Sequence, residues 1–208
     1  MIGIDELKSA KGILKPQKAV GIDNIGNAMI LCVLDNYPEI LLKLFNTILT
    51  SSSIIPEWLI GMIVPIHKKG STSDPENYRG ITVMSCLGKF FLSILNNRLL
   101  KYTIENNILH KSQLGFMKGN RTSDAHIIIN NLIKKYCHTS NAKIYGCFVD
   151  FSSAFDTIHR GLLLKKLLSH GIKGKLFNVI RKVYINDEAC IKVGDKRTNM
   201  FKINIGVS

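Results

Sequence analysis

Hydrophobic residues recur every three or four positions over several long stretches of the chain, the spacing of amphipathic helices. This spacing predicts helices in residues 1–17 (a short helix with a loop), 38–50, 86–107, 123–138, 156–169 and 175–184. Pro38 stands in a first turn, where proline is tolerated, and Thr122 or Ser123 can cap the fourth helix. Gly171 is placed to end the fifth. We expect these apolar faces to form the core.

Other stretches follow the pattern of strands. Residues 58–66 form an apolar run before a basic loop, and residues 189–206 predict a hairpin that turns at Gly194 and Asp195. Residues 143–150 are rich in β-branched and aromatic side chains and have no alternating polar face. They predict a buried central strand, so the chain combines helices with a sheet in an α+β arrangement.

Asp150 stands at the end of this predicted central strand. A carboxylate leaving a buried strand is costly to desolvate unless it is paired, hydrogen-bonded or bound to a metal. Asp150 or Ser152 could cap the helix that follows, which is the commoner arrangement, or Asp150 could hold a hard divalent cation. The stretch alone leaves both interpretations open.

Composition and charge narrow the class of protein. With 208 residues, 46% hydrophobic and 21% charged, the chain can bury a sizeable core in one domain or two closely packed subdomains. Lys and Arg number 28 against 15 Asp and Glu, which gives a net charge of +13. The basic residues are spread from Lys68 to Arg197, so they fit a groove along a phosphate backbone; unrelated solvated faces are the alternative.

The cysteines and the N-terminus bear on localisation. The five cysteines are widely separated and form no CxxC pair, so we expect neither a disulfide framework nor a zinc ribbon. Asp5 and Glu6 stand where a signal peptide needs an apolar run, and no uncharged apolar stretch reaches the length of a membrane span. We therefore expect an intracellular protein, cytoplasmic, nuclear or both.

Four stretches occur in an order that resembles the reverse transcriptase of non-LTR (LINE-like) retrotransposons. They are "KAVGIDNI", "WLIGMIVPIHKKG" with "PENYRGITV", "SQLGFMKGNRTSDA" and "FVDFSSAFDTIHRGLL". The resemblance covers the chain from about Leu7 to Ser208. It implies a right-hand polymerase fold of the α+β class, with an N-terminal extension and fingers in residues 1–140 and an incomplete palm in residues 141–208. We expect exposed apolar surface on that palm and poor solubility.

The resemblance also implies roles for the acidic segment. Asp150 matches the first metal-binding aspartate of the family, and the backbone carbonyl of Phe151 would be a second ligand of Mg²⁺. Two such ions activate the primer hydroxyl and neutralise the leaving pyrophosphate. Phe155 matches the aromatic residue under the incoming sugar, where it would clash with a ribose 2′-OH. A core aromatic is the alternative for Phe155, and Asp156 is expected to favour the dipole of the following helix.

The remaining matches concern phosphate and template. Lys68, Lys69 and Arg79 match positions in the fingers that grip the triphosphate of a deoxynucleoside triphosphate, although exposed lysines in a polar loop are by default simply solvated. The segment that lies against the template is matched by Gln113, Gly115, Phe116, Lys118 and Arg121. The implied partners are therefore an RNA template, a DNA primer and deoxynucleoside triphosphates. In "VGID" we interpret Gly21 as conformational and Asp23 as a turn residue.

The chain departs from the family pattern at its end. Family members follow Gly206 and Val207 with a glutamine-glycine box and then a pair of adjacent aspartates, and this sequence stops before both. It is thus expected to be truncated before the second catalytic aspartate box and not to polymerise DNA by itself. Either it is a fragment of an RNA-directed DNA polymerase, or it is an inactive nucleic-acid-binding remnant or co-opted fragment. A group II intron maturase-like splicing factor is a further, lower-ranked alternative.

Overall fold

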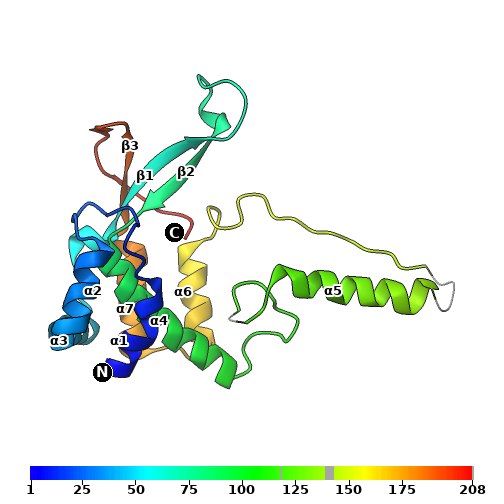
Figure 1. Cartoon of the computed structure of the whole chain (residues 1–208), viewed down its shortest axis with the longest axis horizontal. Helices are drawn as coiled ribbons and strands as arrows, with labels where there is room; N and C mark the ends of the chain where they lie inside the picture. Colours follow the sequence, from blue (N-terminus) through cyan, green and yellow to red (C-terminus); the bar gives the residue numbers. More distant parts are fainter. Residues whose placement is uncertain (118, 139–142, 208) are drawn as a thin grey trace. The chain divides into compact units, whose positions relative to one another are not determined.

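The computed structural model describes residues 1–117, 119–138 and 143–207, which form a mixed α and β structure (Figure 1). Its contacts divide the chain into two compact units: unit 1 comprises residues 1–99 and 153–208, and unit 2 comprises residues 100–152. The α-helices are α1 (Ile4–Ala10), α2 (Asn27–Asn36), α3 (Pro38–Ser51), α4 (Cys86–Glu105), α5 (Thr122–Ile133), α6 (Arg160–Ser169) and α7 (Gly174–Ile185). Short 3-10 turns η1 (Lys11–Ile13), η2 (Pro56–Leu59) and η3 (Pro75–Asn77) and a π-helical turn η4 (Lys134–His138) complete the helical elements.

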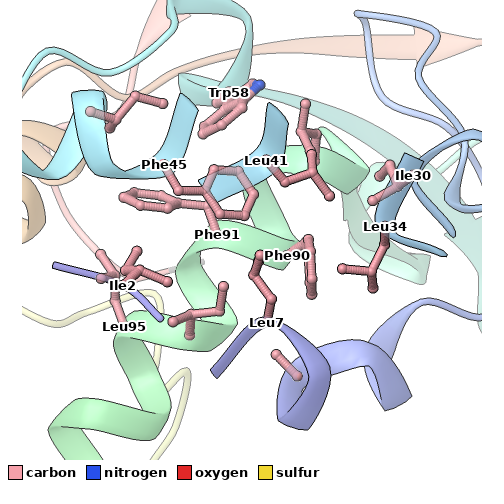
Figure 2. Packing of buried hydrophobic residues seen from close by; sticks show 14 of the residues in the cluster. Ile2, Leu7, Ile30, Leu34, Leu41, Phe45, Trp58, Phe90, Phe91 and Leu95 are labelled. Carbon is pink, nitrogen blue, oxygen red and sulfur yellow. The ribbon is translucent and has the colours of Figure 1, made fainter. Parts of the chain in front are cut away.

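The core of unit 1 is built on aromatic side chains from α3, η2 and α4 (Figure 2). The Phe45 ring lies 5.2 Å from Phe91 and 5.7 Å from Phe90, and Trp58 lies 5.8 Å from Phe91, measured between ring centroids. Tilted and edge-on pairs of this kind stabilise by about 0.5–1.5 kcal/mol each beyond the area they bury. Leu7 of α1 and Ile30 of α2 close the cluster. The helical spacing of apolar positions predicted the contributions of α3 and α4 to this core, whereas Trp58, which was expected in a strand, lies in η2.

A mixed sheet in unit 1 joins distant parts of the sequence. Its order is β2-β1-β3-β4, from the strands β1 (Ile60–His67), β2 (Tyr78–Val83), β3 (Glu188–Val193) and β4 (Lys196–Arg197), and β5 (Phe201–Lys202) also pairs with β3. β1 is antiparallel to β2 and parallel to β3. In Figure 1 the β1–β2 hairpin projects beyond the helices, with β3 beside β1. The helices α4 to α7 lie in the connection between β2 and β3.

Several sequence predictions are confirmed. The helices α3, α4 and α7 begin and end close to the predicted limits, with Pro38 in the first turn of α3. The β3–β4 hairpin turns at Gly194 and Asp195, since Val193 pairs with Lys196. Gly194 has a φ of +60°, a conformation that glycine adopts without steric cost. Helix α2, which lies between the predicted first and second helices, was not anticipated.

The predicted strand at 143–150 is wrong. These residues are irregular and exposed, and the solvent-accessible fractions of Phe148 and Val149 are 89% and 74%. A buried central strand needs hydrogen-bonding neighbours on both edges, and none of the five described strands pairs with this segment. The predicted exposed apolar surface is therefore present at 143–151, although this whole segment belongs to unit 2 and none of it pairs in the sheet.

Two helix starts also differ from the sequence prediction. Helix α6 begins at Arg160 because His159 caps it: the Nδ1 atom of His159 accepts a hydrogen bond from the Leu162 amide at 3.2 Å. Asp156 thus lies in the turn before the helix and not in its first turn. Helix α5 of unit 2 begins at Thr122, and its N-cap is Arg121, whose amide donates to Asp124 at 2.7 Å. Over the part of the chain that is described, no helix combines the length and apolar character needed to cross a bilayer.

Candidate nucleotide and nucleic-acid interface

The loop of the β1–β2 hairpin is held by hydrogen bonds of its own. The Lys68 amide donates to the Asn77 carbonyl at 2.8 Å, and the Asn77 side chain donates to the Ser71 carbonyl at 3.0 Å. The Tyr78 hydroxyl donates to the Thr72 carbonyl at 2.9 Å. Each bond joins residues across the loop and so stabilises this conformation of it. A ligand would meet a preformed surface, which lowers the entropy cost of binding.

The predicted phosphate-binding residues Lys68, Lys69 and Arg79 are brought together at this end of the hairpin, and all three are exposed. Arg79 lies on β2 opposite Ile66 of β1. Among the described residues, none of the three cations has a carboxylate within ion-pair distance. Their positive charge is therefore available to an anion. A guanidinium presents a planar fork and an ammonium a point charge, which together suit a polyphosphate.

A cavity of about 310 Å³ lies at the base of the hairpin. Its lining includes Ile81 and Val83 of β2, Lys18, and Lys89 and Cys86 of α4. Burial raises the pKa of the Cys86 thiol, so this thiol stays protonated at neutral pH. The lining combines apolar carbon with two ammonium groups, a combination that suits a small organic anion.

The start of α4 is anchored to the "VGID" turn. The Ser85 hydroxyl donates to Asp23 Oδ2 at 2.6 Å and accepts from the Gly88 amide at 3.0 Å, so Ser85 caps α4. Asp23 also accepts from the Ile25 amide at 3.3 Å, which confirms its turn role. A Cβ on Gly21 would lie 2.6 Å from the Ser85 nitrogen. Close backbone approach, and not a left-handed φ, is therefore why glycine stands there.

The turn that carries Phe155 is fixed by the segment near the end of the chain. The Val207 amide donates to the Phe155 carbonyl and the Gly206 amide to the Ile158 carbonyl, both at 2.9 Å. Gly206 has a φ of +84°, and a Cβ there would lie 2.9 Å from the Asp156 carbonyl oxygen. The exposed fraction of Phe155 is 54%, so the core-aromatic alternative is wrong.

Arg160 is the residue that joins these segments, and sequence reasoning missed it. Its Nε donates to the Gly206 carbonyl and one Nη to the Tyr184 carbonyl, both at 2.8 Å. The same Nη donates to the Ile203 carbonyl, and the other Nη donates to Asp187 Oδ2 at 2.6 Å. One guanidinium thus joins the start of α6, the end of α7, the start of β3 and the segment 203–206.

The Arg160–Asp187 ion pair is buried: the side chains are 7% and 5% exposed. Burial raises the pKa of the Asp187 carboxyl, and the guanidinium opposes this rise. Burial also raises the pKa of Tyr184, whose ring lies 5.4 Å from the guanidinium carbon. The sequence signal was an arginine at the start of a helix and an aspartate just before a strand.

The predicted template segment belongs to unit 2. Gln113, Gly115, Phe116 and Arg121 are all exposed there. The Gln113 side-chain amide donates to the Gly115 carbonyl at 3.1 Å, and Phe116 has a positive φ of 61°. Lys118 lies outside the described residues. The segment leads directly into the N-cap of α5 at Arg121.

Asp150 and Phe151 are also exposed and lie in unit 2, whereas Phe155 lies in unit 1. Within the described ranges, no group of three or more His, Cys, Asp and Glu side chains could hold a metal ion. Asp150 is thus an exposed carboxylate that belongs to no such group among the described residues, whereas a two-magnesium site needs several oxygen ligands.

Comparison with known proteins agrees with the resemblance read from the motifs. The family model "Reverse transcriptase (RNA-dependent DNA polymerase)" matches residues 66–206, which include Arg79 and Asp150. The "Probable RNA-directed DNA polymerase from transposon BS" of Drosophila melanogaster is 31% identical over 89% of this chain and 20% of its own length. The RNA-directed DNA polymerases of the mobile element jockey are 30% identical in D. melanogaster and 28% in D. funebris, over 79% and 99% of this chain.

The chain spans about a fifth of these relatives: 18% and 22% of the two jockey proteins are matched. The family match nevertheless covers well over half of the chain and includes the β1–β2 hairpin loop, the template segment, Asp150 and Arg160. The chain therefore belongs to the reverse transcriptase (RNA-dependent DNA polymerase) family, and its relatives are the polymerases of non-LTR retrotransposons.

Proposed function

We propose that this chain is the fingers and the front of the palm of a right-hand RNA-directed DNA polymerase, which copies an RNA template from a DNA primer. In this proposal the fingers comprise residues 1–140 and the palm residues 141–208. The observation that carries it is the β1–β2 loop: Lys68, Lys69 and Arg79 are exposed, no described carboxylate lies within ion-pair distance of them, and all three lie within the family match at residues 66–206.

In this proposal, residues of the chain bind the nucleotide and the template strand. Arg79 and the two lysines bind the triphosphate of the incoming nucleotide and orient it. Phe155 lies below the sugar and excludes a 2′-hydroxyl by contact. The exposed residues Gln113, Gly115, Phe116 and Arg121 contact the template strand, where backbone and cationic groups meet phosphate.

Magnesium is the metal that the family implies. Asp150 and the Phe151 carbonyl would supply two oxygen ligands, of the kind that Mg²⁺ prefers. The described residues do not bring further carboxylates to Asp150. The fit of these residues to a two-magnesium site is therefore incomplete.

Primer extension tests the proposal. The transcript is sequenced through codon 208, and the polypeptide it encodes is assayed for extension of a DNA primer on an RNA template. Asp150→Asn is expected to abolish extension, whereas Asp156→Asn, a matched change in the neighbouring turn, leaves it intact. Equal extension by both variants would overturn the role of Asp150. RNA binding without any extension would instead favour an inactive binding remnant.

Nucleotide binding tests the hairpin separately. Arg79→Gln removes charged hydrogen bonds of about 1.5–3 kcal/mol, so the affinity for a deoxynucleoside triphosphate should fall by about tenfold or more. Lys43→Gln, an exposed lysine on α3, is the control with the same change of charge. Fluorescence anisotropy with a labelled nucleotide measures both. The triphosphate role of Arg79 is wrong if the two variants bind alike.

A further inference from the structure

The strand register places cations from three strands on one face of the sheet. Met62 of β1 pairs with Cys190 of β3, and Ile66 of β1 pairs with Arg79 of β2. Side chains two residues apart in a strand share a face, and directly paired residues share it too. Arg79 is therefore on the same face as Met62, Cys190 and the residue two beyond Cys190, Lys192.

Lys192 has a cation as its direct partner across the β3–β4 hairpin, because it pairs with Arg197. Like charges directly opposite each other destabilise a strand pair. Among the described residues, neither cation has a carboxylate within ion-pair distance. Glu188 on the same strand lies opposite Lys202 of β5 in the strand register, and Asp195 lies in the turn. An anion bound between Lys192 and Arg197 would remove this repulsion.

Exposed apolar side chains lie beside Arg79 on this face. Ile66 of β1 is its direct partner and Ile81 lies two residues along β2, with exposed fractions of 48% and 45%. Met62 and Cys190 on the same face are buried, so only the part of the face nearer the β1–β2 loop is open. Arg197 is exposed and Lys192 half-buried. The face thus presents cations together with exposed apolar side chains. A nucleic-acid strand offers the complementary pattern, since phosphates alternate with the apolar surfaces of sugars and bases.

We propose that Lys192 and Arg197 together bind a backbone phosphate of a single-stranded RNA that lies across this face of the sheet. The β3–β4 hairpin is then a nucleic-acid contact in its own right, separate from the β1–β2 loop that binds the nucleotide. This inference rests on the proposed function in one respect: it takes RNA as the partner. The opposed cations of the hairpin are the observation that carries it.

Salt-dependent binding of a fluorescein-labelled oligouridylate to the 208-residue chain tests the inference. The variant Lys192→Gln/Arg197→Gln is compared with Lys165→Gln/Lys166→Gln, which removes the same charge from exposed positions on α6. Loss of one phosphate contact should reduce the slope of log K against log salt by about 0.7 on a single strand. At about 0.1 M salt this corresponds to an affinity about fivefold lower. The α6 variant should keep the wild-type slope.

The remaining outcomes separate the inference from the proposed function. If the wild-type chain binds RNA and the two double variants have equal slopes and affinities, the hairpin assignment alone is overturned. If the hairpin variant loses affinity for a deoxynucleoside triphosphate but not for RNA, the bound anion is a free polyphosphate and the assignment is again wrong. If the wild-type chain shows no salt-dependent RNA binding, both proposals fail. The melting temperature of the hairpin variant should not fall, because its change removes a repulsion.

Discussion

Arg160→Met should be among the most destabilising single substitutions in this chain. The change leaves the Asp187 carboxylate, 5% exposed, without its partner. Removing one member of a buried ion pair costs about 3–5 kcal/mol, because the other charge stays buried and uncompensated. The free energy of unfolding of a domain of ordinary stability is about 5–15 kcal/mol, so this loss is a large fraction of the total.

The geometry predicts more than the loss of a charge pair. Arg160 also donates to the carbonyls of Tyr184, Ile203 and Gly206. The double variant Arg160→Met/Asp187→Leu removes the unpaired carboxylate but leaves these carbonyls without a donor. A buried polar group left unsatisfied costs about 1–3 kcal/mol. The double variant should therefore recover only part of the stability lost in the single variant.

Urea unfolding followed by circular dichroism measures these free energies, and amide exchange at Gly206 and Val207 reports the local effect. Lys11→Met is the control: it breaks an ion pair whose members are 45% and 54% exposed, and it should cost no more than about 1 kcal/mol. If Arg160→Met costs no more than Lys11→Met, the buried contacts of Arg160 do not stabilise the chain as proposed. If the double variant regains wild-type stability, the hydrogen bonds from Arg160 to the three carbonyls contribute nothing to the free energy of unfolding.

Three further predictions concern backbone fit and pH. Gly206→Ala should destabilise the chain by about 1–3 kcal/mol more than Gly174→Ala in urea unfolding, because both have positive φ but only the first meets backbone atoms within 4 Å; equal costs would contradict this. Gly21→Ala should lower the free energy of unfolding by about 1–3 kcal/mol, since its Cβ would meet the backbone at the start of α4; an unchanged value would mean that the turn yields freely. A hydrogen bond from Arg98 lowers the pKa of Glu6, so the stability that Glu6 contributes is present above its unfolded pKa of about 4.3 and is lost as pH falls through the lower folded value. The Glu6–Arg98 pair is partly exposed, so wild type and Glu6→Gln should differ in free energy of unfolding by at most about 1 kcal/mol at pH near 7. This difference should vanish in acid. A difference that grew in acid would refute the stabilising role of the ionised Glu6 carboxylate.

Local pattern was sufficient for the elements whose stability is local. The apolar spacing of α3 and α4 predicted both helices and the faces that meet in the core, because each helix buries one stripe. The β3–β4 hairpin followed from Gly194, since its turn needs only two residues. The basic loop before Arg79 could likewise be predicted from sequence as a polar segment after an apolar strand.

The failures all involve residues whose environment is set by distant segments. Residues 143–150 have strand composition, but a strand exists only where neighbours complete its hydrogen bonds, and composition says nothing about those neighbours. Arg160 looked like an ordinary charged residue at the start of a helix, and its burial depends on segments 24 to 46 residues away in sequence. The same limit applies to predicting the role of Asp150 from sequence. A motif identifies the carboxylate, but a metal site also needs other oxygen ligands, and these depend on which segments the fold brings close to Asp150. Primer extension with Asp150→Asn tests whether such a site forms.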